Sequence, residues 1–174
     1  ILVFAGFFTA YFINSSFLFL LALYFFLNIG YSFGLKNIPI LDIFIIAIGF
    51  ALRVRSGGNI AKVDVTIWLN IMIFLLALFM AAGKRRDDVL LKISSGNDMR
   101  KSVKGYTLDF LNALLALISS VMIVSYFMYT VSDRVIERHE TNRLYLTSLF
   151  VMAGIMRYLQ IIYVNADSGS PTKI

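Results

Sequence analysis

A run of five charged residues, Lys84-Arg85-Arg86-Asp87-Asp88, carries the clearest candidate chemistry of the chain. It follows a long apolar stretch and places three cations beside two carboxylates. Lysine and arginine neutralise phosphate oxygens, and magnesium bridges carboxylates to a diphosphate. The run therefore predicts a loop that binds a phosphorylated ligand together with a divalent metal. The alternative is a basic cluster at the cytoplasmic end of a membrane helix, which the positive-inside rule produces without any ligand.

Four further residues are expected on the same side of the membrane: Lys36, Lys104, Tyr106 and Arg157. Arg157 lies within an apolar helix, where a cation is costly unless it is paired, solvated or snorkelling to the interface. Snorkelling and ligand binding therefore both stay open for it. The convergence of these residues with the charged run favours a binding site over a simple helix end.

Other charged residues are expected to be solvated or structural. Asp42 and Asp109 lie in the first turn of expected helices, where a carboxylate complements the helix dipole, and we prefer this interpretation to a catalytic one. Arg53 and Arg55 are expected to close a helix in solvent. His139, the only histidine, lies in a charged link and is expected at the surface.

Six apolar stretches, which we expect to be helices, position these residues. The clearest, 65–82, has no charge between Asp64 and Lys84 and is long enough to cross a hydrocarbon core of roughly 30 Å. A segment in lipid must be helical because its backbone finds no other hydrogen-bond partners there. The sequence thus predicts an all-α, polytopic transmembrane helix bundle that forms a single domain. The expected spans are 1–13, 17–33, 39–52, 65–82, 107–131 and 144–164.

Composition excludes an ordinary soluble surface, because 59% of the 174 residues are hydrophobic, 15% are charged and the mean hydropathy is +0.81. The absence of cysteine excludes disulfides and thiolate metal sites. Ile1 lies inside an apolar run and residues 167–174 resemble a loop that leads onward, so we expect a fragment of a longer protein. Alternating the spans across the bilayer puts nine basic residues on the side of the charged run and six on the other. This excess predicts that the charged run faces the cytoplasm.

Five segments, in this order and spacing, resemble the UbiA superfamily of intramembrane prenyltransferases. They are 31–42 (YSFGLKNIPILD), 49–53 (GFALR), 83–86 (GKRR), 105–107 (GYT) and 154–158 (GIMRY). Within the superfamily they are most similar to the decaprenyl-phosphate phosphoribosyltransferase branch. The resemblance covers nearly the whole chain.

The resemblance implies nine transmembrane helices around a central cavity, of which about six, helices three to eight, are present here. The first aspartate-rich motif of the superfamily, Asn-Asp-x-x-Asp, would precede Ile1. The second, Asp-x-x-x-Asp, is absent, because Asp87 and Asp88 are followed four residues later by leucine and lysine. The superfamily's Tyr-x-x-x-Lys element is also stretched, since Tyr31 and Lys36 are five apart. These departures favour the phosphoribosyltransferase branch.

The resemblance also implies a reaction and its partners. A magnesium-dependent transferase in the inner (plasma) membrane would move 5-phosphoribose from phosphoribosyl diphosphate to a polyprenyl phosphate and release pyrophosphate, without a general base. The implied catalytic and metal-binding carboxylates are Asp87 and Asp88, of which one is expected to serve because neighbours on a helix point about 100° apart. The implied substrate-binding residues are Lys36, Lys84, Arg85, Arg86, Lys104, Tyr106 and Arg157.

Without the first aspartate-rich motif, the fragment itself is expected to be inactive. Nucleic acid is not an expected partner, and homo-oligomer formation stays open. Two other functions also stay open: a prenyltransferase that joins a prenyl diphosphate to an aromatic acceptor, and a non-enzymatic transporter or lipid-binding protein.

Overall fold

The computed structural model describes residues 2–95 and 105–164, and all regular structure within them is helical. The α-helices are α1 (Leu2–Ile13), α2 (Ser15–Phe33), α3 (Leu41–Ala61), α4 (Ile67–Ser95), α5 (Leu108–Thr130), α6 (Asp133–His139) and α7 (Thr147–Val164). Two short 3₁₀ turns, η1 (Leu35–Asn37) and η3 (Leu144–Leu146), precede α3 and α7. The predicted all-α class is confirmed.

Five helical segments are long and apolar enough to cross a membrane: Ser15–Phe33, Leu41–Ala61, Ile67–Ile93, Leu108–Thr130 and Leu144–Val164. Each presents large apolar side chains on its outer surface, as a lipid-facing helix does. These segments indicate a multi-pass membrane protein. The span expected at 1–13 corresponds to α1. This helix has only 12 residues, which is fewer than the about 20 that a helix needs to cross a membrane.

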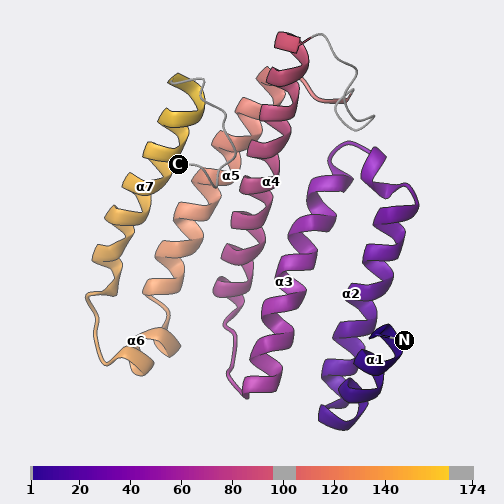
Figure 1. The fold of residues 1–174 in the computed structure, drawn as a ribbon. Coiled ribbons are helices and arrows are strands. Elements are labelled where there is room, and N and C mark those ends of the chain that lie inside the picture. Colours follow the sequence, from indigo (N-terminus) through magenta and orange to yellow (C-terminus); the bar gives the residue numbers. More distant parts are fainter. Residues whose placement is uncertain (1, 96–104, 165–174) are drawn as a thin grey trace.

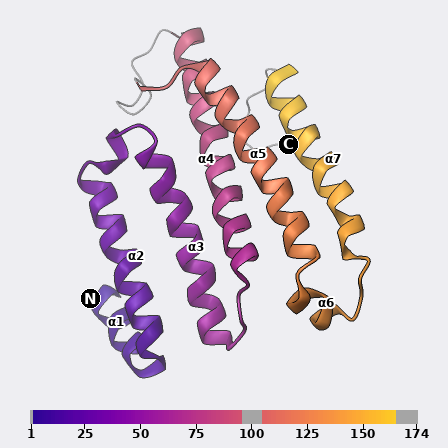
Figure 2. The same cartoon turned by 180° about the vertical axis from the view of Figure 1, so that it is seen from behind.

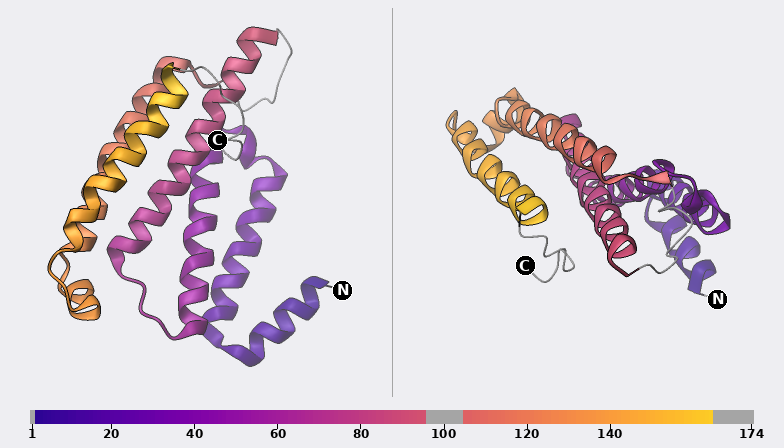
Figure 3. Two further views of the ribbon diagram at one scale, coloured as in Figure 1. Left: turned by 60° about the vertical axis from the view of Figure 1, so that its left-hand side comes forward. Right: turned by 90° about the horizontal axis from the view of Figure 1, so that it is seen from above.

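The long helices run alternately up and down and pack against their neighbours in chain order (Figures 1 and 2). Helix α4 lies between α3 and α5, and α7 packs on the far side of α5. Seen from above, the helices follow one another in an open row, so that α7 does not reach α2 (Figure 3). Helix α1 turns back against α2 at Asn14, whose side chain caps α2 by accepting a hydrogen bond from the Ser16 N–H at 2.8 Å.

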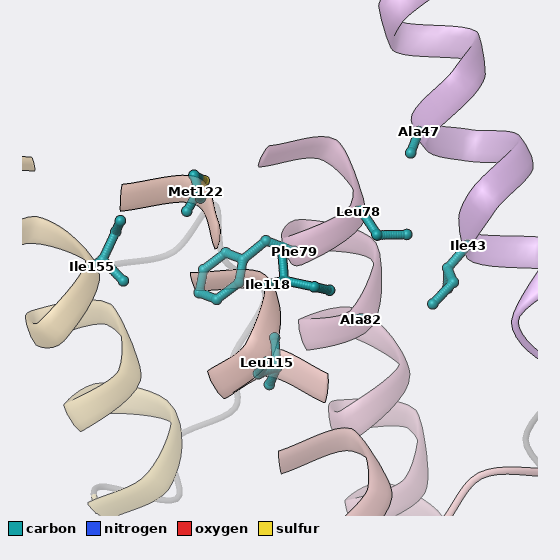
Figure 4. Close-up of a cluster of buried hydrophobic side chains, with 9 residues drawn as sticks. All are labelled: Ile43, Ala47, Leu78, Phe79, Ala82, Leu115, Ile118, Met122 and Ile155. Atoms are coloured by element: carbon teal, nitrogen blue, oxygen red, sulfur yellow. The ribbon is translucent and has the colours of Figure 1, made fainter. Parts of the chain in front are cut away.

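A buried apolar cluster joins α3, α4, α5 and α7 (Figure 4). Leu78 of α4 points toward Ile43 and Ala47 of α3, whereas the adjacent Phe79 points the other way, toward α5 and α7. Hydrophobicity alone does not hold helices together in lipid, so close van der Waals packing must do so. The fully buried Ala47 and Ala82 fit this requirement, because small side chains let helix backbones approach.

Two predicted boundaries are wrong. The span expected at 39–52 continues as α3 to Ala61, and the charged run expected in a loop lies inside α4, which ends at Ser95. The physical reason is the same in both cases: a charged residue ends an apolar stretch, but it does not interrupt backbone hydrogen bonding. Arg53 and Arg55 therefore lie within a helix, and Arg53 donates hydrogen bonds to the Tyr24 hydroxyl.

Candidate active site

A buried ion-pair cluster lies where the upper end of α3 meets α4 and the segment just before α5 (Figure 1). Asp42 in the first turn of α3 is fully buried, and its Oδ2 accepts a hydrogen bond from Arg85 Nε at 2.6 Å. Arg85 Nη1 donates to Asp88 Oδ2 at 2.8 Å. The Tyr106 hydroxyl donates to Asp42 Oδ1 at 2.7 Å. Asp42 thereby links α3, α4 and the segment before α5.

The backbone around the cluster is shaped to bring Tyr106 to Asp42. A Cβ on Gly105 would lie 2.1 Å from Pro39 Cγ, so only glycine lets this segment approach the α2–α3 link. Ile40 adopts a φ of 69°, which is strained for a β-branched residue, and its N–H donates to the Tyr106 hydroxyl oxygen at 2.5 Å. Burial, together with the hydrogen bond to Asp42, raises the pKa of Tyr106 well above its usual range. Tyr106 therefore stays protonated and able to donate to Asp42.

Arg86 joins the other side of α4 to α5 and α7. Its Nε donates to Asn112 Oδ1 at 2.8 Å, and its Nη1 donates to the Ile162 carbonyl oxygen at 3.0 Å. The guanidinium carbon lies 5.1 Å from the centre of the Tyr163 ring. The Tyr163 hydroxyl in turn donates to the Asn112 carbonyl oxygen at 3.0 Å. Arg86 is thus a buried connection between three helices.

Asp87 differs from both of its charged neighbours. Its side chain is half-buried, and its Oδ1 is buried with no hydrogen-bond partner among the described residues. Gly83 lies one turn earlier on the same face of α4, and a Cβ there would lie 3.0 Å from the Tyr158 hydroxyl of α7. A buried acceptor without a partner is costly, so this position suits a ligand that donates hydrogen bonds or carries positive charge.

The remaining predicted cations that the structure describes form no hydrogen bond or ion pair with the cluster. Lys36 and Lys84 are exposed and form no ion pair with any described residue. Arg157 is also exposed, and its Nη1 donates to Gln160 Oε1 at 2.8 Å. Lys104 lies outside the described residues. No described hydrogen bond or ion pair joins these cations to Arg85, so their shared phosphate pocket stays a prediction.

The central role of Asp42 was not predicted, because a carboxylate in the first turn of a helix was interpreted as a partner of the helix dipole. The sequence did carry one signal for this role. Burying an unpaired carboxylate at the start of an apolar helix costs free energy, so a buried Asp42 would need a cation beside it. Asn112 carried no signal of its own, because only packing brings it to Arg86. Within residues 2–95 and 105–164, no group of three or more histidine or acidic side chains could hold a metal ion by itself.

Sequence comparison finds relatives that align along most of the chain. The chain is 30% identical over 158 residues to a decaprenyl-phosphate phosphoribosyltransferase of Corynebacterium glutamicum. The aligned residues make up 88% of the chain and 46% of that relative. It is 31% identical over 155 residues to the protein of the same name from Mycolicibacterium smegmatis, covering 86% of the chain and 48% of the relative. This chain is a homologue of those proteins. The resemblance to this branch predicted from the motifs is confirmed.

A protein of the same name from Mycobacterium tuberculosis is 27% identical over 109 residues, which is 63% of the chain and 36% of that relative. No family model matches the chain. The chain spans about half the length of the curated relatives it matches.

Proposed function

We propose that this chain is part of an intramembrane transferase of the UbiA type that moves 5-phosphoribose from phosphoribosyl diphosphate to a polyprenyl phosphate. Pyrophosphate is the second product. The observation that carries the proposal is the 30% identity, over 88% of the chain, to a protein named decaprenyl-phosphate phosphoribosyltransferase. The motifs at the upper end of the helix row support the same function.

The chemistry suits a cationic membrane end. Breaking the bond between the anomeric carbon and the diphosphate builds negative charge on the leaving group, and fixed cations stabilise that charge. The new bond forms from an oxygen of the polyprenyl phosphate, which is already ionised and needs no general base. The exposed Lys36 and Lys84 are free to meet phosphate oxygens. The apolar helices offer the environment that a polyprenyl tail requires.

We divide the predicted site residues into two roles according to their contacts. Arg85, Arg86 and Tyr106 are committed to interhelical bonds, so we assign them to positioning the site. Asp88 is committed to Arg85 and holds that side chain in place. Asp87 is the carboxylate left for ligand, and we assign it to the ribose hydroxyls or to magnesium.

Magnesium fits this assignment. Mg²⁺ usually binds one or two carboxylates and completes its coordination with substrate phosphates and water, so a single free carboxylate such as Asp87 is sufficient. Bound there, the ion would neutralise charge on the diphosphate. Asp87 alone is the described residue that we assign to hold it.

We further propose that the Arg85 end faces the cytoplasm and that the protein resides in the plasma membrane. The excess of basic residues on this side supports the orientation. Partners would then be the membrane, phosphoribosyl diphosphate and the polyprenyl phosphate.

The proposal is tested by supplying purified full-length protein with alternative donors. We expect pyrophosphate release and a phosphoribosylated lipid when phosphoribosyl diphosphate, magnesium and a polyprenyl phosphate are present together. Omitting the lipid should abolish pyrophosphate release. Turnover seen only with a prenyl diphosphate and an aromatic acceptor would refute the proposed donor.

A further inference from the structure

A second charged site lies at the end of the helix row opposite Arg85, between the α3–α4 link and α6 (Figure 1). Here a cavity of about 310 Å³ is lined by Lys62, Asp64, Arg134 and Arg138, with Tyr129 from the end of α5. The volume is at the lower limit of small-ligand pockets, which measure roughly 300 to 1,000 Å³. The cavity can therefore hold a small ligand or the headgroup of a larger one.

The three cations of this cavity outnumber its one carboxylate, Asp64. Among the described residues, ion pairs join only Arg85 to Asp42 and Asp88, so Lys62, Arg134 and Arg138 are unpaired. Asp64 lines the same cavity and forms no ion pair with any described residue. Three cations beside one carboxylate repel one another, and a bound anion would offset that repulsion.

Local structure directs these side chains to one place. Arg134 and Arg138 are four residues apart on α6 and therefore share a face, while the buried Val135 anchors the helix to the bundle. Lys62 ends α3 with a φ of 53°, a left-handed conformation that usually favours glycine. A lysine thus occupies a position where a glycine would be less strained.

We propose that this cavity binds a phosphate group. Arginine recognises phosphate through paired N–H donors, and lysine adds a compact positive charge. The phosphate can belong to an anionic lipid headgroup or to a soluble phosphate compound. This inference is independent of the proposed transferase function, because it concerns other residues at the opposite end of the bundle.

The test uses purified full-length protein in phosphatidylcholine nanodiscs and has two arms. One arm titrates inorganic phosphate and glycerol phosphate and follows the unfolding temperature, which rises when a ligand binds the folded state. The other adds phosphatidic acid to the nanodiscs and counts retained lipid by native mass spectrometry. Binding in the first arm identifies a soluble ligand, and binding in the second alone identifies a lipid headgroup; either supports the proposal.

Variants decide whether the binding belongs to this cavity. The double substitution Arg134→Gln with Arg138→Gln should weaken binding at least about tenfold, because charge-assisted hydrogen bonds are lost. Asp64→Asn should strengthen it. Arg143→Gln is the matched control. Arg143 is an exposed cation that follows α6 in the chain, and it does not line the cavity.

Four results would overturn the proposal. They are no binding by the wild type in either arm, binding that survives the double substitution, an equal loss of binding in the Arg143 control, and a signal that Lys84→Gln abolishes. The last result would assign the phosphate to the candidate active site. Transferase activity is not the readout, so the two proposals can fail separately.

Discussion

The two ends of the helix row use the same kind of residue in opposite ways. At the upper end, Arg85 and Arg86 are 4% and 7% exposed, and each donates hydrogen bonds to at least one neighbouring helix. At the lower end, Arg134 and Arg138 are exposed and form no ion pair with any described residue. A buried arginine must be paired because its desolvation is costly, whereas an exposed one is free to bind an anion. Burial therefore separates the positioning cations from the candidate ligand-binding ones.

The largest expected effect comes from breaking the buried pair at its fully enclosed partner. Asp42→Ala leaves Arg85 without its α3 carboxylate and Tyr106 without an acceptor, so the free energy of unfolding should fall by about 3–5 kcal/mol. Denaturant titration in mixed micelles measures this. Asp109→Ala is the control, because Asp109 is an exposed carboxylate in the first turn of α5 and should change stability little. Equal losses in the two variants would mean that burial does not distinguish them.

A second comparison concerns two adjacent carboxylates. Asp88→Asn weakens the pair with Arg85 and should lower the free energy of unfolding by about 1–3 kcal/mol. Asp87→Asn should preserve stability and reduce phosphoribosyl transfer by roughly 100-fold, because the carboxylate assigned to magnesium or to the ribose hydroxyls is lost. Unfolding and turnover are measured on the same samples. An inactive but stable Asp88 variant beside a fully active Asp87 variant would reverse the assignment.

Tyr106→Phe tests the neutral part of the cluster. Losing the hydroxyl removes the bond to Asp42 and leaves the Ile40 N–H without its acceptor, at a cost of about 1–2 kcal/mol. Because the folded-state pKa of Tyr106 is raised, its contribution is complete below about pH 10 and is lost as the pH rises further. The stability difference between wild type and variant should therefore narrow above pH 10. Tyr145→Phe, an exposed control, should show no such narrowing.

The smallest effect is expected at the lower end. Arg134→Gln should change the free energy of unfolding by less than about 0.5 kcal/mol in the absence of ligand, since the side chain forms no described ion pair. Arg85→Gln, measured alongside, should cost several times more. A large loss of stability in Arg134→Gln would mean that Arg134 is a structural cation like Arg85. The two ends of the helix row would then not differ in the role of their arginines.

Much of the fold could be predicted because lipid permits few structures. Apolar stretches of about twenty residues had to be helices, and the expected spans 17–33, 107–131 and 144–164 lie close to α2, α5 and η3 with α7. Helix ends next to charged residues could not be predicted in the same way. Helices α3 and α4 continue through Arg53 and through residues 84–88, because charge affects solvation and leaves the backbone hydrogen bonds intact.

The candidate site was predictable in composition but not in arrangement. The run at 84–88 was found from its charge pattern, and the geometry of a helix already required its neighbouring side chains to point in different directions. Asp88 pairs with Arg85, while Asp87 Oδ1 has no hydrogen-bond partner among the described residues. This difference depends on which face of α4 meets α3 and which meets α7.

The sequence by itself determined the class of the protein, its membrane helices and its relatives, because hydrophobicity and local motifs are properties of the chain. Only the tertiary structure decided the roles of individual charges. Asp42 and Arg85 are 43 residues apart, and Arg86 meets Ile162 across 76 residues. Whether a charge is paired or free depends on its surroundings, and helix packing alone creates those surroundings.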